Sequence, residues 1–118
     1  MSELPAKGSE RQFYRVTFPV VERPWFQIDG RRYEVIDVSE YGVKFLHSNS
    51  ESFSPGRAVQ GTILFHDGTS SAVSGNVLRT LNLRHVSECI VQLTTGVPLS
   101  QITAQQRYLK QKFPGRKQ

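Results

Sequence analysis

Apolar and polar residues alternate along most of the chain with the period of two that is typical of half-buried β-strands. In residues 31–38, Tyr33 and Val35 fall on one face and Glu34 and Ile36 on the other. An earlier β-prone stretch contains Pro19 and Pro24, so the first strand is either broken or begins after the second proline. We predict six strands, at residues 25–28, 31–38, 43–46, 58–65, 71–83 and 85–93.

The connections between these strands are mostly tight turns. Asp29-Gly30 and Asp67-Gly68 are strong hairpin signals, because both dipeptides tolerate the positive φ angles that tight turns need. Gly75, inside the longest strand, indicates a β-bulge. Short strands joined by tight turns predict an antiparallel barrel or sandwich rather than alternating βα units.

After residue 98 the period changes from strand to helix. Ser100 is the expected N-cap, and Pro114 ends the periodic run. The apolar residues at near-helical spacing are Ile102, Tyr108, Leu109 and Phe113. We predict a terminal amphipathic helix of about three turns whose apolar stripe packs on the barrel or on a second copy, which leaves a homodimer through this helix as a possibility.

The predicted organisation is a flexible leader at residues 1–10, a barrel domain at 11–98, a helix at 99–113 and a basic tail at 114–118. A length of 118 residues suits one domain with a single core. No apolar run approaches the ~20 residues that cross a bilayer, and the polar first residues do not resemble a secretory signal. The single cysteine, Cys89, fits a reducing compartment, so we expect a cytoplasmic protein without membrane insertion.

The net charge of +5 comes from the end of the chain. Residues 1–104 contain ten basic and ten acidic residues, whereas residues 105–118 contain five basic residues and no acidic one. Such an end is consistent with nucleic acid, an anionic membrane or an acidic partner, or it is a solvated terminus. The barrel itself is therefore expected to be neutral.

Two arginines four residues apart, Arg11 and Arg15, stand just before the predicted barrel. A guanidinium forms paired hydrogen bonds with phosphate and with the N7/O6 edge of guanine, and its flat face stacks on a base. The spacing suits two such groups directed at one anionic, planar target. A chain with ten arginines contains such a pair by chance about once, so the meaning of the pair depends on what lies opposite it.

Residues 37–42 form a second motif, Asp-Val-Ser-Glu-Tyr-Gly, at the end of a predicted strand. Asp37 supplies an acceptor carboxylate, Ser39 a small hydroxyl, and Gly42 a turn position tolerant of positive φ. A carboxylate of this kind suits the N1–H and N2–H₂ edge of guanine, and the glycine lets a flat ligand approach the backbone. By chance the pattern occurs about 0.04 times in a chain of this composition.

The two motifs together resemble those of the PilZ domain family, which has R-x-x-x-R just before a six-stranded barrel and [D/N]-x-S-x-x-G after the second strand. The similarity covers the chain from Arg11 to the C-terminal helix, and the Pro55-Gly56 turn before the fourth strand agrees with it. In the last strand, family members often have a glycine in an I-G-V-x-F pattern, where residues 88–93 here read Glu-Cys-Ile-Val-Gln-Leu. The resemblance implies an all-β fold, a six-stranded antiparallel β-barrel with a C-terminal α-helix.

The resemblance also implies a function: a bacterial, stand-alone receptor for the second messenger cyclic di-GMP. In the family the two arginines bind guanine edges and phosphates, which maps onto Arg11 and Arg15. The second motif maps onto Asp37, Ser39 and Gly42, which line the barrel surface beneath a guanine. We expect binding to change the conformation of the N-terminal arginine segment and so to signal to a partner protein.

The partner is not identified by the sequence. The resemblance implies motility, exopolysaccharide or biofilm control, and the basic helix and tail are the candidate contact. Gln12 and Tyr41, which neighbour the motif residues in the sequence, are further ligand-binding candidates. No catalytic residues, metal ligands or cofactor are expected.

Two other classes of protein fit the sequence less well. An enzyme is disfavoured because His47, His66 and His85 have no Ser, Cys or Asp partner at a recognisable spacing, and His85 with Cys89 gives two ligands, too few for a zinc site. A small-barrel binder of single-stranded nucleic acid is the alternative function. It would stack bases on aromatic side chains, but a neutral barrel lacks the basic groove that such proteins use. Its stacking candidates are Phe13, Tyr14, Tyr33 and Tyr41.

Overall fold

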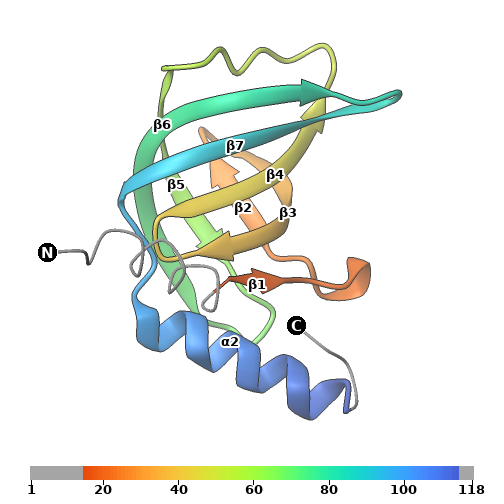
Figure 1. Ribbon diagram of the computed structural model, residues 1–118, viewed down its shortest axis with the longest axis vertical. Helices are drawn as coiled ribbons and strands as arrows, with labels where there is room; N and C mark the ends of the chain where they lie inside the picture. The colour runs from red at the N-terminus through yellow and green to blue at the C-terminus, as the bar shows by residue number, and fades with distance from the viewer. Residues whose placement is uncertain (1–14, 115–118) are drawn as a thin grey trace, which may run out of the picture.

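Six antiparallel strands close into a barrel in the computed structural model, which describes residues 15–114 (Figure 1). Around the barrel the strands follow the order β3-β2-β5-β6-β7-β4, and β4 pairs with β3 to close it, while β1 extends the edge of β3. The predicted all-β fold with a C-terminal helix is confirmed. The elements are β1 (Val16–Thr17), η1 (Val20–Glu22), β2 (Trp25–Ile28), β3 (Arg31–Ser39), β4 (Gly42–Ser48), β5 (Ala58–Leu64), β6 (Ser70–Asn82), β7 (Val86–Thr95) and α2 (Leu99–Lys112).

The first strand is broken, as the two prolines indicate. Strands β1 and β2 both pair with β3, β1 through Val16 opposite Val38 and β2 through Trp25 opposite Glu34. Between them the chain forms the 3-10 turn η1, which follows directly after Pro19. Since proline has no N–H to donate to a ladder, the pairing stops there and resumes on the same strand after the turn. This arrangement brings β1 beside the second half of β3.

The two predicted hairpin turns are present. Asp29 and Gly30 have φ angles of 50° and 82°, as in the two-residue turn that joins twisted strands, and they connect β2 to β3. Gly68, with a φ of 92°, lies in the turn between β5 and β6. These positive angles explain why glycine follows aspartate at both places.

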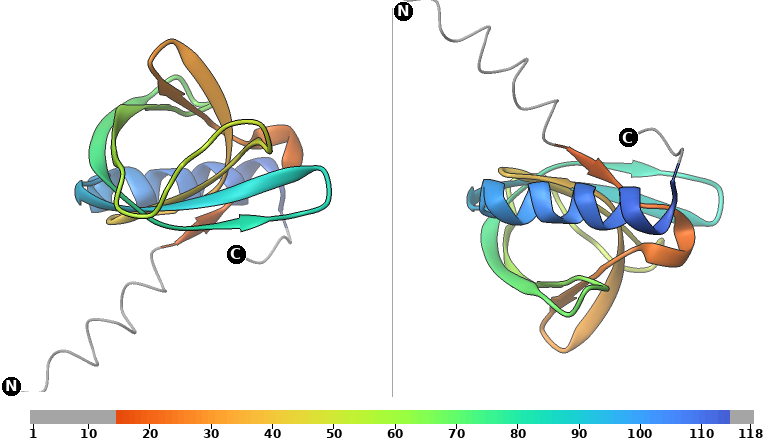
Figure 2. Two further views of the ribbon diagram at one scale, coloured as in Figure 1. Left: turned by 90° about the horizontal axis from the view of Figure 1, so that it is seen from above. Right: turned by 90° about the horizontal axis from the view of Figure 1, so that it is seen from below.

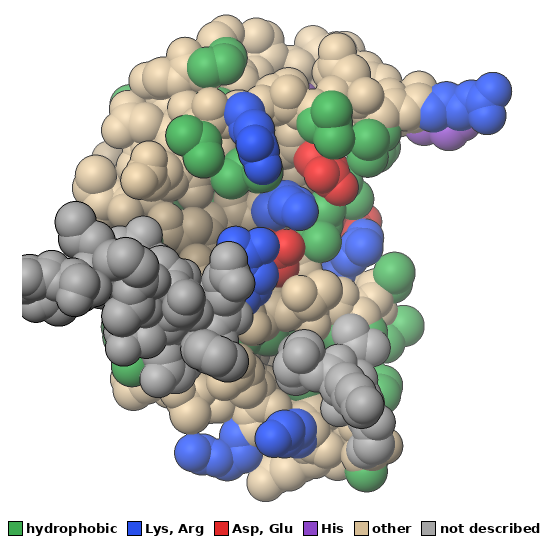
Figure 3. Space-filling model, viewed as in Figure 1, with side chains coloured by type: hydrophobic (Ala, Val, Ile, Leu, Met, Phe, Trp, Pro, Cys, Tyr) green, Lys and Arg blue, Asp and Glu red, His purple; other side chains and the backbone are tan. Residues whose placement is uncertain are grey.

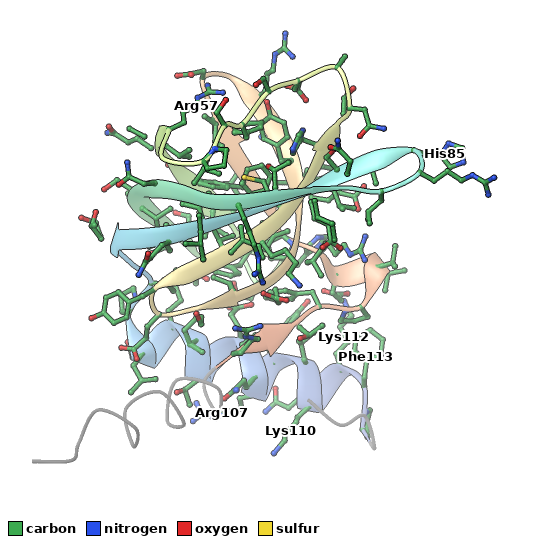
Figure 4. All side chains as sticks on the ribbon, turned by 45° about the horizontal axis from the view of Figure 1, so that its top comes forward. Arg57, His85, Arg107, Lys110, Lys112 and Phe113 are labelled. Atoms are coloured by element: carbon green, nitrogen blue, oxygen red, sulfur yellow. The ribbon has the colours of Figure 1, made fainter. Side chains whose placement is uncertain are left out.

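Shifts in register bend the sheet at three places. The predicted irregularity at Gly75 is confirmed by a shift between Ser74 and Gly75 in the β6–β7 ladder. A second shift in that ladder lies between Val77 and Arg79, and β3–β4 has one between Val35 and Asp37. The sequence pattern did not predict the last two. The β6–β7 hairpin extends beyond the barrel, and His85 points outward at its tip (Figures 1 and 4).

The barrel interior contains an aromatic cluster that includes a histidine. Val43, Phe45 and His47 are alternate residues of β4, and all three are buried. The His47 ring centroid lies 4.8 Å from that of Phe53. The predicted strand at residues 43–46 is therefore too short, because the alternation of β4 continues two residues further and turns the His47 ring inward.

Helix α2 covers one end of the barrel (Figure 2). The helix residues that face the barrel are almost completely buried, so the apolar stripe packs within the chain. They are Ile102, Gln105 and Leu109. Gln105 Nε2 donates to Asp67 Oδ2 over 2.8 Å and so ties the helix to the β5–β6 turn. The helix begins at Leu99 after Pro98 and shows no side-chain cap bond. The prediction of Ser100 as N-cap is wrong, because Pro98 occupies the N-cap position and Ser100 already lies inside the helix.

The far side of α2 is basic. Arg107 and Lys110 point away from the barrel, whereas Lys112 turns back toward it (Figure 4). Lys112 Nζ lies 2.7 Å from Glu22 Oε2, and Tyr108 donates its hydroxyl to the same carboxylate over 3.2 Å. The hydrogen bond from Lys112 is the main reason why the pKa of Glu22 lies below its usual value. This contact joins the end of the helix to the η1 turn.

Candidate functional site

Four of the predicted site residues lie together on the outside of the barrel. Arg15 directly precedes β1, Asp37 and Ser39 belong to β3, and Gly42 is the first residue of β4. They line one pocket of about 200 Å³. Arg11 and Gln12 lie outside the described residues. The other residues that line the pocket are Val43, Lys44, Leu78, Arg79 and Ile90.

The strand registers explain this convergence. Thr17 of β1 is opposite Asp37, so Arg15, two residues earlier on an antiparallel strand, lies toward Ser39. On the other edge of β3, Asp37 is opposite Lys44 and Ser39 is opposite Gly42. Side chains two residues apart on a strand share a face, so the acceptor groups of β3 point to the same side. The pocket is therefore a consequence of β1 returning beside β3 after the break.

Backbone hydrogen bonds from the end of β7 and the segment after it hold the β3–β4 turn that carries the motif. Its two residues are Glu40 and Tyr41, and their carbonyl oxygens accept hydrogen bonds from Val97 N–H and Leu93 N–H, both at 2.9 Å. A Cβ on Gly96 would collide with the carbonyl oxygen of Glu40. The chain that leads from β7 to α2 thus supports the turn and needs a glycine to approach it this closely.

Gly42 is present for space rather than for backbone conformation. Among the described residues, the glycines with positive φ are Gly30, Gly56 and Gly68, so Gly42 does not use the positive φ that a glycine tolerates. The reason is that Gly42 already pairs with Ser39 as the first residue of β4. A Cβ at this position would lie 3.2 Å from Ser39 Oγ, tighter than ordinary van der Waals contact. The glycine leaves the hydroxyl and the pocket open.

Asp37 is a largely buried carboxylate beside two cations. Burial raises the pKa of its carboxyl above the usual value, and the nearby Lys44 and Arg15 oppose that rise. Lys44 Nζ lies 3.7 Å from Asp37 Oδ2. Glu88, on β7, adds to the rise as a nearby like charge. The pocket therefore combines an acceptor with cations, a combination that suits a ligand with both N–H donors and anionic groups.

Lys44, Leu78, Arg79 and Ile90 were not identified as site residues from the sequence. Lys44 could have been found, because it stands two residues after Gly42 on a strand and so shares its face. The two residues from β6 have no local signal. They reach the pocket because β7 lies between β6 and β4 and because the register shifts between Val77 and Arg79. Basic and acidic side chains gather on this face of the molecule (Figure 3).

Two aromatic candidates lie elsewhere. Tyr41 is 46% exposed on the β3–β4 turn, where its ring approaches Gly96, and it is not part of the pocket lining. Tyr33 is buried and donates its hydroxyl to Glu51 Oε2 over 2.6 Å. A buried ring cannot stack on a base, so the expectation that Tyr33 serves nucleic-acid binding is wrong. Phe13 and Tyr14 lie outside the described residues.

Within residues 15–114, no three His, Cys, Asp or Glu side chains lie close enough together to hold a metal ion. In the same part of the chain, no helix has the length and apolarity needed to span a membrane.

Comparison with known proteins supports the fold. No family model and no curated protein matches the sequence. The chain is similar to the solved structure of the inhibitor of motility MotI/DgrA from Bacillus subtilis, with a TM-score of 0.61 at 14% sequence identity. The match covers 87% of this chain and 51% of the other, so this chain spans about half the length of that protein. The shared feature is the fold.

Proposed function

We propose that this protein is a receptor for cyclic di-GMP, with the pocket between β1, β3 and β4 as its site. The observation that carries the proposal is that Arg15, Asp37, Ser39 and Gly42, taken from two separate motifs, line a single pocket on the barrel surface. Cyclic di-GMP has two guanines and two phosphodiester anions. A carboxylate acceptor and forked cations complement different parts of that molecule.

Each residue has a role that its position supports. Asp37 accepts from the N1–H and N2–H₂ edge of one guanine, and the Ser39 hydroxyl beside it adds a second polar contact. Gly42 leaves the space above the strand through which the flat base approaches. Arg15 binds a guanine edge or a phosphate from the open side of the pocket, together with Arg11, which lies outside the described residues.

The signal passes from the arginine segment to a partner protein. Arg15 is the residue at which that segment joins β1, and Gln106 Nε2 of α2 lies 3.5 Å from its carbonyl oxygen. A change of conformation at Arg15 therefore alters its contact with the helix. The outward-pointing Arg107 and Lys110 offer an acidic partner a contact on the other side of α2 (Figure 4). The similar fold of an inhibitor of motility supports a role in controlling motility in the bacterial cytoplasm.

Calorimetric titration tests the proposal. The wild-type chain should bind cyclic di-GMP with a micromolar or tighter dissociation constant and should not bind a single-stranded oligonucleotide. Arg15→Ala should abolish the binding of cyclic di-GMP while leaving the melting curve unchanged. Arg32→Ala is the matched control, because Arg32 is an exposed arginine of β3 outside the pocket lining.

Three results would contradict the proposal. They are binding of the oligonucleotide alone, equal loss of binding in both arginine variants, and a large loss of stability in Arg15→Ala, which would make that arginine structural. The conformational part has its own test. Amide exchange in residues 5–15 should slow when cyclic di-GMP is added. Co-purification of a partner with and without the ligand then tests the signalling step.

A further inference from the structure

Arg79 of β6 lines the candidate pocket, although it stands 37 residues after the second motif and 64 residues after the first in the sequence. We infer that Arg79 is a further ligand-binding residue and that it binds a phosphodiester group of the nucleotide. The inference rests on the proposed function, because it assigns one part of the same ligand to a strand that neither motif includes. Three independent features of the structure support it.

The first feature is the position of Arg79 in the sheet. The pairings place Arg79 opposite Ile90, Ile90 opposite Lys44, and Lys44 opposite Asp37, so these residues form one row across β6, β7, β4 and β3. Adjacent strands lie about 4.8 Å apart, which separates the Cα atoms of Arg79 and Asp37 by about 14 Å along the sheet. The long arginine side chain shortens that gap. A ligand held by its guanine edge at Asp37 extends along this row toward Arg79.

The second feature is the register shift between Val77 and Arg79. In a regular strand, successive side chains alternate between the two faces, so one of Leu78 and Arg79 would point into the barrel. The shift leaves both residues exposed on the outside, with Leu78 at 54% exposure, while Val77 remains in the core. Bulges of this kind re-aim side chains next to binding sites. Here the bulge gives the pocket both a cation and an apolar rim.

The third feature is the distribution of charge. Lys44 is already paired with Asp37, at 3.7 Å. Within the described residues 15–114, Arg79 has neither an ion-pair partner nor a side-chain hydrogen bond, so its donors are available to a ligand. Ile90 lies between the two cations and, with Leu78, provides an apolar surface. A base or ribose can rest on that surface while the Arg79 fork takes the phosphate, which it matches in geometry.

The experiment is a calorimetric titration of the full chain with cyclic di-GMP at low and at moderate salt. Arg79→Gln should weaken binding by about tenfold or more, the expected loss for a charge-assisted hydrogen bond. It should also flatten the dependence of affinity on salt, because one screened contact is gone. Arg84→Gln is the control. Arg84 is exposed in the β6–β7 turn, lies outside the pocket lining and changes the net charge equally. It should bind within about twofold of the wild type.

The outcomes separate this inference from the proposed function. If the wild type binds and Arg79→Gln binds equally well with the same salt dependence, the inference is wrong and the receptor proposal stands. Equal losses in Arg79→Gln and Arg84→Gln also overturn it, since they indicate a general charge effect. A wild type that does not bind overturns both. Melting curves show whether each variant folds. If Arg79→Gln does not fold, Arg79→Lys replaces it. That variant keeps the charge but lacks the forked guanidinium, so it should lose part of the binding affinity.

Discussion

Lys44 Nζ lies 3.7 Å from Asp37 Oδ2, across the pair of strands that carries the second motif. Both side chains are mostly shielded from solvent, with 27% and 12% exposure. Burial disfavours the ionised form of the Asp37 carboxylate, and the Lys44 cation stabilises that form. In the proposed complex, a guanine edge that hydrogen-bonds to Asp37 would replace part of this stabilisation.

Asp37→Asn should separate binding from stability. Because the pKa of Asp37 is raised in the folded chain, its protonated form is favoured by folding. The stability that this group contributes is present below the ordinary aspartate pKa and is lost as the pH rises through the folded value. At neutral pH, Asp37→Asn should therefore keep or raise the melting temperature while weakening cyclic di-GMP binding by about tenfold or more. Thermal unfolding at about pH 7 and about pH 3, with calorimetry, checks both.

Lys44→Gln is the matched control for that variant. It leaves the buried carboxylate without its nearest cation, so the melting temperature at neutral pH should fall, in contrast with Asp37→Asn. A fall in melting temperature of the same size in both variants would show that the ion pair stabilises the fold as a unit, contrary to this expectation.

Gly42→Ala should weaken binding with little effect on the fold. The backbone at Gly42 does not have a positive φ, so alanine is compatible with it, but the new Cβ lies 3.2 Å from Ser39 Oγ and enters the pocket. We expect a loss of cyclic di-GMP binding of about tenfold or more and a change in unfolding free energy within about 1 kcal/mol. Calorimetry and denaturant unfolding measure the two effects.

Gly68→Ala should give the opposite result. Gly68 has a φ of 92°, and no atom lies within 4 Å of the place that an added Cβ would occupy, so the cost is backbone strain of about 1–2 kcal/mol. Gly68 is not part of the pocket lining, and binding should be unchanged. If Gly42→Ala lost stability and kept binding, the role assigned to its missing side chain would be wrong.

The sequence predicted the parts of this molecule that depend on local rules. Alternation located the six barrel strands, because each strand has one face in the core, and Asp29-Gly30 located a hairpin, because few other residues adopt its φ angles. Asp37 and Ser39 were singled out by their spacing to Gly42, and the structure places both on β3 beside β4.

The remaining parts depend on pairings that alternation does not encode. Arg79 and Ile90 reach the pocket because the β4–β7 ladder joins segments far apart in the chain and the β6–β7 hairpin extends that sheet. The predicted strand at residues 43–46 stopped short of His47 because the polar side chain interrupts the apolar pattern, although the strand continues and buries the ring. Gln105 was not predicted to be buried, because the Asp67 carboxylate that accepts from its amide lies 38 residues away in the sequence.

The Tyr33–Glu51 hydrogen bond predicts a loss of stability in alkali. Burial, followed by the bond to Glu51, raises the pKa of Tyr33 to about 12. Since the folded value lies above the ordinary one, the contribution to stability is complete below about pH 10 and is lost as the pH rises toward about 12. Absorbance titration should show a late tyrosinate signal that is absent from Tyr33→Phe. The variant should also unfold with a weaker dependence on pH in that range. Titration of every tyrosine near the ordinary value would contradict the assignment.

Leu109→Ala should loosen helix α2 and, with it, the start of β1. Leu109 is fully buried between the helix and the barrel, and its truncation should cost about 2–5 kcal/mol of unfolding free energy. Leu99→Ala is the control on the same helix, because Leu99 is 38% exposed and its truncation should cost much less. Denaturant unfolding measures both.

The same pair of variants tests whether the helix is coupled to the arginine segment. Helix α2 lies against β1 and β3, and Gln106 contacts the carbonyl of Arg15. Amide exchange at Val16 and Thr17 should therefore increase in Leu109→Ala and remain unchanged in Leu99→Ala. If Leu109→Ala destabilised the chain without accelerating exchange in β1, helix docking and the position of Arg15 would be independent.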